Sequence, residues 1–369
     1  MGIQDLTRTI KKHAPAAIET LEPVNLPGVH YGVDVFSYLY PAKYNPGAKG
    51  KGQHIRFFFD LICAWRQAGK QLIMVFDGNT SLVEAKSETV QKRAEARQKT
   101  RDIIQEAQTA INEGIGTMQD HLELQRALRN NIKIEETDIT ELKTLFTFMN
   151  VPYYQAVGEA DSLLASLHTS GLITGVITED SDLLTHGVAL VVRGLIDGKN
   201  RSAGLVNLYK LDTVLTGLKM SMSQFIDFCI LSGCDYCPRI PGLGPVTALK
   251  HVSNGGNPLT CDQPDESYKD KYLVARQMFT EHEPIPAVET VKIDGDDLKS
   301  WMLKNTNFTE KTLTDKLELK VKVKEPVQVQ VKENNQPVGE GGADLVDPFD
   351  PKPKITVKVK VKVKAKVKG

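Results

Sequence analysis

Short apolar and β-branched runs alternate with helical patterns from about residue 30 to residue 250. Three such runs, at 33–36, 72–76 and 175–178, each lead into acidic or turn residues. Helical patterns lie between them, at 56–68, 141–149 and 160–168. Strands that alternate with helices form a parallel sheet that is covered by helices on both faces. The sequence therefore predicts an α/β fold with a parallel-type central sheet, whose ligands bind at the carboxyl ends of the strands.

Seven carboxylates follow the expected strands or open the expected helices. They are Asp34, Asp77, Glu159, Asp161, Asp180, Asp182 and Asp235. Each of them alone could be a turn residue, a helix cap or a charge favoured at a helix N-terminus. Because parallel strands end at one edge of a sheet, we expect these side chains to gather there. Such a cluster would repel itself and its pKa values would rise unless cations neutralised it.

Clustered carboxylates indicate hard divalent cations, which prefer oxygen ligands. Two such ions about 4 Å apart can activate a water and stabilise the leaving oxygen of a phosphodiester. Neither a Ser-His-Asp arrangement nor a Gly-rich phosphate loop competes with this interpretation, and His282 does not belong to an HExxH motif. Cys234 and Cys237 match CxxC, but the sequence has no second pair at zinc spacing. The pattern therefore favours phosphodiester hydrolysis.

Two further segments could contact phosphate. Gly242 and Gly244 stand between apolar residues ahead of a helical pattern, so they could form a tight hairpin whose N–H groups receive a phosphate. A plain turn between two helices fits that segment equally well. Residues 79–135 are charged and helical in composition, with Lys86 and Arg93 among their basic residues. Composition alone favours a solvated helix face there over an arm that meets phosphate.

The C-terminal segment, residues 318–369, largely alternates Lys and Val. Its last 18 residues hold eight Lys and no acid, so the rest of the neutral chain carries a net charge of −8. Repulsion between the Lys side chains opposes strand pairing, so we expect a disordered tail that holds a polyanion through salt-sensitive contacts. The start of the chain lacks a signal-peptide pattern, no apolar run approaches the ~20 residues of a membrane helix, and the five cysteines lack a disulfide framework. We expect a protein of a reducing compartment, neither secreted nor bound to a membrane.

Over about residues 1–315 the chain resembles the flap endonuclease/XPG family of structure-specific 5′ nucleases. The resemblance lies in Met1-Gly2-Ile3 with Leu6, Gly32-Val33-Asp34, Val75-Phe76-Asp77-Gly78, Gly158-Glu159-Ala160-Asp161, Thr178-Glu179-Asp180-Ser181-Asp182, residues 229–236 and residues 240–249. It implies a PIN-like core in which the seven carboxylates hold two Mg²⁺ ions, with Mn²⁺ as a substitute. One departure is Asp161, which stands where the family has Glu and is one methylene shorter. A ligand that acts through water tolerates this change, although the metal preference can shift.

The resemblance also assigns roles outside the carboxylates. It makes residues 79–135 a helical gateway or cap, in which Lys86 and Arg93 contact the scissile phosphate, and so reverses the interpretation from composition. Tyr40 resembles the family tyrosine that stacks on a nucleobase. Gly242 and Gly244 match the helix–hairpin–helix element that holds duplex phosphate, in relatives through K⁺.

Together these observations predict a Mg²⁺-dependent endonuclease that cuts 5′-flap or branched DNA in replication, repair or recombination. The expected parts are a nuclease region at 1–78, the gateway at 79–135, a second nuclease region with the hairpin at 136–317, and the tail at 318–369. A 5′→3′ exonuclease, a bubble or junction nuclease, a non-catalytic DNA-binding relative and a PIN-type ribonuclease are the alternatives. We expect a monomer in the nucleus, or in the host nucleus if a virus encodes the chain. The sequence has no clear sliding-clamp motif, and residues 346–349 are a poor substitute for one.

Overall fold

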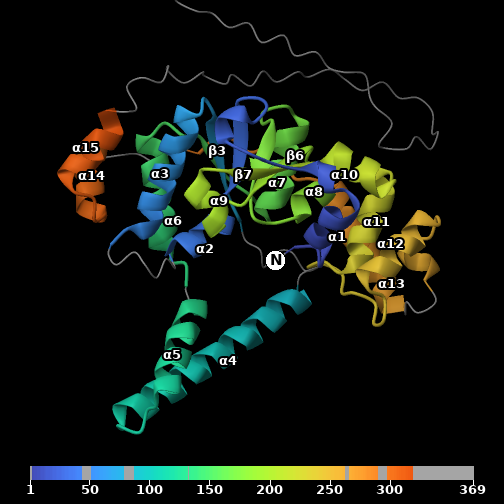
Figure 1. Cartoon of the computed structure of the whole chain (residues 1–369), viewed down its shortest axis with the longest axis horizontal. Helices are drawn as coiled ribbons and strands as arrows, with labels where there is room; N and C mark the ends of the chain where they lie inside the picture. The colour runs from blue at the N-terminus through green and yellow to red at the C-terminus, as the bar shows by residue number, and fades with distance from the viewer. Residues whose placement is uncertain are drawn as a thin grey trace, which may run out of the picture. The chain divides into compact units, whose positions relative to one another are not determined.

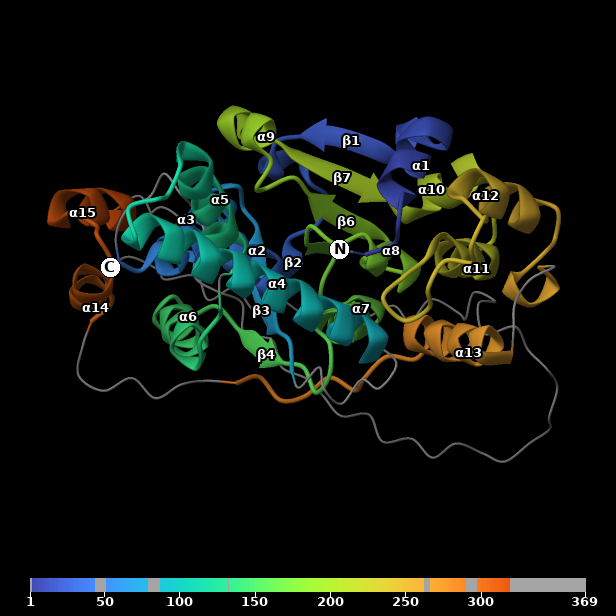
Figure 2. The ribbon, with the colours of Figure 1, turned by 90° about the horizontal axis from the view of Figure 1, so that it is seen from below.

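The computed structural model describes residues 2–43, 51–78, 87–131, 133–261, 266–289 and 297–318 (Figure 1). Within them, seven strands form one sheet in the order β1-β7-β6-β5-β2-β3-β4, which Figure 2 shows from β1 at the top to β4 at the bottom. The strands are β1 Ile18–Leu21, β2 His30–Asp34, β3 Gln71–Phe76, β4 Tyr153–Gln155, β5 Gly175–Ile177, β6 Leu190–Arg193 and β7 Val206–Lys210. The sheet is parallel from β6 to β4, but β7 is antiparallel to both β6 and β1. The expectation of a parallel sheet is therefore correct for its centre, and the β1–β7 edge makes the sheet mixed.

The strand predicted at residues 33–36 is wrong at its end, because β2 stops at Asp34 and helix α2 begins at Val35. The Asp34 carboxylate explains the change of direction, since its Oδ1 accepts a hydrogen bond from the backbone N of Ser37 at 3.2 Å. A side chain that satisfies a free N–H of the first helical turn starts a helix. The same residue thus ends the strand and begins the helix.

Helices cover both faces of the sheet, as the alternation predicts (Figure 1). The described helices are α1 Leu6–His13, α2 Val35–Lys43, α3 Gln53–Gln67, α4 Ser87–Asn112, α5 Met118–Asn130, α6 Glu136–Phe148, α7 Ala160–Thr169, α8 Asp182–Thr185, α9 Gly198–Ala203, α10 Leu211–Leu218, α11 Met222–Ser232, α12 Pro245–Ser253, α13 Glu266–Thr280, α14 Leu298–Asn305 and α15 Glu310–Glu318. One apolar core joins the sheet to α1, α7, α8 and α10–α13, and a second joins its other face to α2, α3, α6, α14 and α15. The two cores fix the sheet between two helical layers.

Helices α4 and α5 pack against each other as a helical pair (Figures 1 and 2). Helix α5 begins with a reciprocal cap, in which Asp120 N donates to Thr117 Oγ1 at 3.3 Å and Thr117 N donates to Asp120 Oδ2 at 2.6 Å. Among the pair's described side chains, Ala107 and Ala127 are the buried apolar ones. The pair therefore rests on little apolar surface of its own, in keeping with its polar composition.

In the described ranges, no single helix is long and apolar enough to cross a membrane. The apolar pair α10 and α11 passes a test of length and composition, but it is bent by 81°. Buried residues of both helices belong to the first apolar core.

Candidate metal centre

Six of the seven predicted carboxylates come together at the carboxyl edge of the sheet. Asp34 ends β2, Asp77 follows β3 and Asp180 follows β5, and these three strands are parallel neighbours. Asp182 opens α8, Glu159 is the N-cap of α7, and Asp161 lies in the first turn of α7. Three strand ends and the starts of α7 and α8 thus supply the cluster.

Asp34 lies at the buried centre of this cluster, with 8% of its surface exposed. Its Oδ2 accepts a hydrogen bond from Thr178 Oγ1 at 2.9 Å. Burial, and then the negative charges of Asp77 and Asp180, raise the pKa of Asp34 to about 7. Near neutral pH this carboxyl is therefore poised between its neutral and charged forms.

Asp161 experiences the strongest crowding of charge. Burial is the largest cause that raises its pKa well above the usual range, and four neighbouring carboxylates add to it: Asp180, Asp34, Asp182 and Glu159. Like charges that are held together and shielded from water destabilise their ionised forms. The cluster thus favours protons or cations as counter-charges.

Hydrogen bonds fix the loop that carries Glu159. Asp77 Oδ1 accepts from the backbone N of Ala160, the first residue of α7, at 2.8 Å. The Tyr236 hydroxyl donates to Glu159 Oε2. The side chain of Gln155 donates to the backbone O of Asp77. Asp77 and Glu159 are consequently oriented by groups from three different segments.

The N-terminal residues pack against the carboxylates of the β5–α8 turn. The backbone N of Ile3 donates to Asp182 Oδ1 at 2.7 Å. Gly2 has a φ of +98°, and a Cβ atom there would lie 2.0 Å from Asp180 Oδ1. The backbone conformation favours glycine at this position, and a Cβ atom would displace the Asp180 carboxylate.

Asp235 lies in the half-buried loop that follows α11. The charges that most raise the pKa values of Asp34 and Asp161 are those of the other carboxylates in the cluster. Tyr236, the neighbour of Asp235, reaches the cluster through Glu159. The structure therefore places Asp235 on the loop beside the cluster and connects that loop to it.

Comparison with known proteins identifies the chain's relatives. The XPG N-terminal domain matches residues 1–100, and the XPG I-region matches residues 150–235. Flap endonuclease 1 of Cryptosporidium muris is 31% identical over 342 residues, which cover 84% of this chain and 70% of that protein. The chain belongs to the flap endonuclease/XPG family. Flap endonuclease 1 of Glycine max is 28% identical over 348 residues, which cover 88% of this chain and 87% of that protein.

Solved structures of the family share the fold. The catalytic core of Rad2 in complex with DNA substrate matches with a TM-score of 0.60 and 20% identity, over 86% of this chain and 99% of that one. Flap endonuclease-1 from Methanococcus jannaschii matches with a TM-score of 0.60 and 19% identity, over 82% and 94% of the two chains. Membership of the family makes this chain a structure-specific nuclease, and hence a hydrolase. The two matched family regions contain all seven predicted carboxylates.

The remaining predicted residues of this flap endonuclease/XPG chain lie on separate elements. Tyr40 is exposed on α2, with its ring centroid 6.4 Å from that of Phe36. Gly242 forms an exposed turn with a φ of +81°, and Gly244 is the N-cap of α12. A Cβ atom at either glycine would meet no atom within 4 Å, so the turn borders open space. Lys86 lies outside the described residues, as does the side chain of Arg93, whose backbone belongs to α4.

Sequence reasoning missed several residues that orient the carboxylates. Thr178 Oγ1 donates to Asp34 and accepts from the backbone N of Asp180 at 3.0 Å, so it links the Asp34 carboxylate to the backbone of Asp180. Its signal was its place directly before the acidic run. Glu179 in the same run points elsewhere, since its Oε1 accepts from the backbone N of Gly194 at 2.9 Å and of Leu195 at 3.0 Å.

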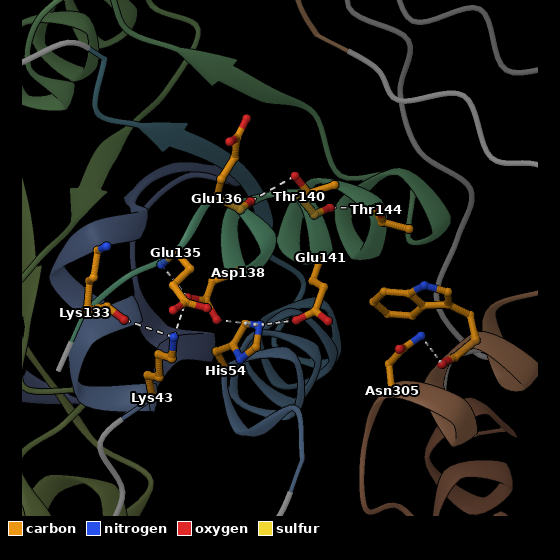
Figure 3. A network of polar contacts seen from close by, with 11 residues as sticks. Lys43, His54, Lys133, Glu135, Glu136, Asp138, Thr140, Glu141, Thr144 and Asn305 are labelled. Atoms are coloured by element: carbon orange, nitrogen blue, oxygen red, sulfur yellow. Dashed lines mark hydrogen bonds and ion pairs between the residues drawn. The ribbon is translucent and has the colours of Figure 1, made fainter.

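A second polar cluster lies between α2, α3 and α6 (Figure 3). His54 Nε2 is 2.9 Å from Glu141 Oε2 and 3.9 Å from Asp138 Oδ1, a spacing that could also hold a metal ion. However, Lys43 Nζ lies 2.5 Å from Asp138 Oδ2 and also donates to the backbone O of Lys133 at 3.0 Å. Because an ammonium already neutralises the buried Asp138, we interpret the cluster as an ion-pair network that fastens α6 to α2 and α3. None of the seven predicted carboxylates belongs to it.

Proposed function

We propose that this chain is a Mg²⁺-dependent endonuclease that hydrolyses phosphodiester bonds in 5′-flap or related branched DNA. One observation carries the proposal: Asp34, Asp161 and four further carboxylates come together in a chain that belongs to a nuclease family. A protein that only binds DNA has little use for such a cluster, because its negative charges repel the phosphates of DNA.

The residues present fit divalent metal ions. Each predicted ligand offers carboxylate oxygen, the donor that Mg²⁺ and Mn²⁺ prefer over nitrogen or sulfur. The raised pKa values of Asp34 and Asp161 reflect an uncompensated charge that cations would relieve. When bound, two such ions would lower the pKa of a water molecule and stabilise negative charge on the phosphate. We propose that Asp235 joins the six clustered carboxylates as a ligand, directly or through water.

The chain's own residues would orient these ligands and the substrate. Thr178 holds Asp34, and Tyr236 holds Glu159, so neither carboxylate needs to reorganise when metal binds. We assign Lys86 and Arg93 to the scissile phosphate, where cations stabilise the charge that develops on its oxygens.

DNA recognition would depend on shape, because backbone contacts carry no sequence information. We assign Gly242 and Gly244 to duplex phosphate, with K⁺ as a candidate bridge, and Tyr40 to stacking on a base near the site. The open space beside both glycines and the exposure of Tyr40 support these assignments. The pair α4–α5 would form the gateway for the single strand.

The names of the structural neighbours support branched DNA as the substrate class. Rad2 is described in complex with DNA substrate, and human GEN1, which matches with a TM-score of 0.56 and 17% identity, in complex with Holliday junction DNA. The second name favours junction cleavage as the alternative activity, and a 5′→3′ exonuclease is a third. We further propose that the enzyme acts as a monomer in the nucleus, and we assign it no sliding-clamp partner.

Cleavage of an end-labelled 5′-flap duplex tests the proposal, with Mg²⁺ or with EDTA. A single-stranded 5′ end and a four-way junction serve as competing substrates. We expect cutting near the flap junction that requires Mg²⁺ and is lost in Asp180→Asn, while DNA binding survives. Asp212→Asn is the matched control, because the same chemical change falls on an exposed residue of α10.

Two outcomes would contradict the proposal. Binding of the flap without cleavage in Mg²⁺ or Mn²⁺ would favour a non-catalytic DNA-binding relative. Full activity of Asp180→Asn would remove the carboxylate cluster as the site of chemistry.

A further inference from the structure

Glu283 lies outside the predicted site, in the extended segment that follows α13. Its carboxylate accepts two backbone hydrogen bonds, from Val157 N to Oε1 and from Gly158 N to Oε2, both at 3.2 Å. These two residues directly precede Glu159. One carboxylate thus holds the backbone that leads into the proposed metal-binding loop.

The main chain of Glu283 binds helix α7, which follows the same loop. Its N–H donates to Ser162 Oγ at 2.8 Å, and its carbonyl O accepts from Ser166 Oγ at 2.5 Å. Both serines belong to α7, on either side of Leu164. Glu283 therefore contacts residues on both sides of the Glu159-Ala160-Asp161 run.

Gly78 binds the same loop through its backbone. Its backbone N donates to Gly158 O at 2.8 Å, and a Cβ atom at Gly78 would lie 2.1 Å from Ala156 O. Gly158 is therefore held by its carbonyl through the residue that follows Asp77 and by its N–H through Glu283. With both groups bonded, the loop has little freedom to rotate its peptide planes.

The segment that carries Glu283 connects two parts of the protein. It leaves α13, which packs against α11 beside the hairpin helix α12. Farther along, Glu289 N donates to Tyr153 O of β4 at 3.1 Å, and Glu289 pairs with Lys143 at 2.9 Å. Because the segment is held at both ends, the backbone of Glu283 is fixed and its carboxylate can hold the loop in place.

We propose that Glu283 is a positioning residue, which fixes Glu159 and Asp161 in the arrangement that binds metal. The inference rests on the proposed function, because it takes those two carboxylates as metal ligands. Bonds between backbone N–H groups and a carboxylate are among the stronger hydrogen bonds in proteins. Their replacement by weaker or absent bonds should loosen the loop before it affects the fold.

The test compares Glu283→Gln and Glu283→Ala with the wild type and with Glu281→Gln. Glu281 is exposed two residues earlier in the same segment, so its variant is the matched control. Two readouts are needed: the Mg²⁺ concentration at half-maximal flap cleavage, and hydrogen–deuterium exchange of the amides of residues 157–161. Thermal melting in Ca²⁺ gives metal binding without turnover.

We expect Glu283→Gln to raise the Mg²⁺ midpoint about threefold and Glu283→Ala about tenfold, because the first weakens and the second removes the two hydrogen bonds to the loop. Exchange at residues 157–161 should rise in the same order, while KM for flap DNA and the behaviour of Glu281→Gln stay unchanged. An unchanged Mg²⁺ midpoint in Glu283→Ala would overturn the inference, whether or not the affinity for DNA changes.

Failure of the proposed function would look different. The wild type itself would then show no Mg²⁺-dependent cleavage and no Ca²⁺-dependent rise in melting temperature. The exchange experiment would still report whether Glu283 orders the loop.

Discussion

The buried carboxyl of Asp34 makes the metal-free protein sensitive to pH. Its pKa is raised from an ordinary 3.8 to about 7, so the folded state binds this proton more tightly than the unfolded chain does. The stabilisation is fully present below the unfolded pKa and is lost as the pH rises through 7. Relative to low pH, the shift of about three pKa units lowers the free energy of unfolding by about 4 kcal/mol at pH 8. At pH 5 it lowers that free energy by about 2 kcal/mol.

Asp34→Asn removes the charge and keeps the shape. Without divalent metal, the variant should be more stable than the wild type. Its free energy of unfolding should exceed that of the wild type by about 4 kcal/mol at pH 8 and by about 2 kcal/mol at pH 5. Relief of the neighbouring carboxylates is included in this figure, because Asp77 and Asp180 contribute to the shift. Mg²⁺ should reverse the order, since the wild type keeps one more carboxylate and binds the ion more tightly.

Urea unfolding in EDTA at pH 5 and pH 8 provides the measurement, and the same titrations in Mg²⁺ complete it. Asp212→Asn is the control and should change the unfolding free energy by less than about 0.5 kcal/mol, as exposed substitutions do. The reasoning fails if Asp34→Asn is no more stable than the wild type at pH 8 in EDTA. It also fails if the difference does not shrink toward pH 5, because burial of charge would then not be its cause.

Two further predictions concern single contacts. Tyr236→Phe removes the hydroxyl that donates to Glu159, a hydrogen bond worth about 2 kcal/mol when the acceptor is charged. Single-turnover cleavage should therefore slow by about 30-fold. Unchanged cleavage would show that Glu159 needs no orientation by Tyr236. Lys43→Met leaves the buried Asp138 without its ammonium partner and should lower the unfolding free energy by about 2 kcal/mol, less than a fully buried pair because Lys43 is partly exposed. Lys299→Met, which breaks an exposed pair with Glu310, is the control for urea unfolding and should leave the free energy of unfolding nearly unchanged. Equal effects of the two lysine variants would mean that the network in Figure 3 adds no more than a surface ion pair.

The sequence predicted the centre of the fold because the signals there are local. The apolar runs that became β2, β3 and β5 are buried strands, and each is followed by a carboxylate at its end. Strands β1, β4, β6 and β7 were not predicted, although β6 is also a short apolar run and β7 passes directly into α10. The antiparallel edge depends on how β7 pairs with β1, across more than 180 residues of chain.

The sequence by itself predicted which seven carboxylates form the candidate site and that they follow strands or open helices. Residue type and spacing along the chain contain that information, and the resemblance to the nuclease family uses nothing else. Only the tertiary structure decided which neighbours orient them. Thr178 turns toward Asp34 while the adjacent Glu179 binds the backbone of residues 194–195, although both stand in one acidic run.

Glu283 shows the same limit over a longer range. It meets Gly158 across 125 residues, through a segment whose path depends on α13 at one end and on β4 at the other. A hydrogen bond requires two groups to come within about 3 Å, and spacing along the chain does not specify that distance for segments joined by other elements. The residue types of the candidate site can therefore be predicted from the sequence, whereas its geometry results from the packing of helices against the sheet.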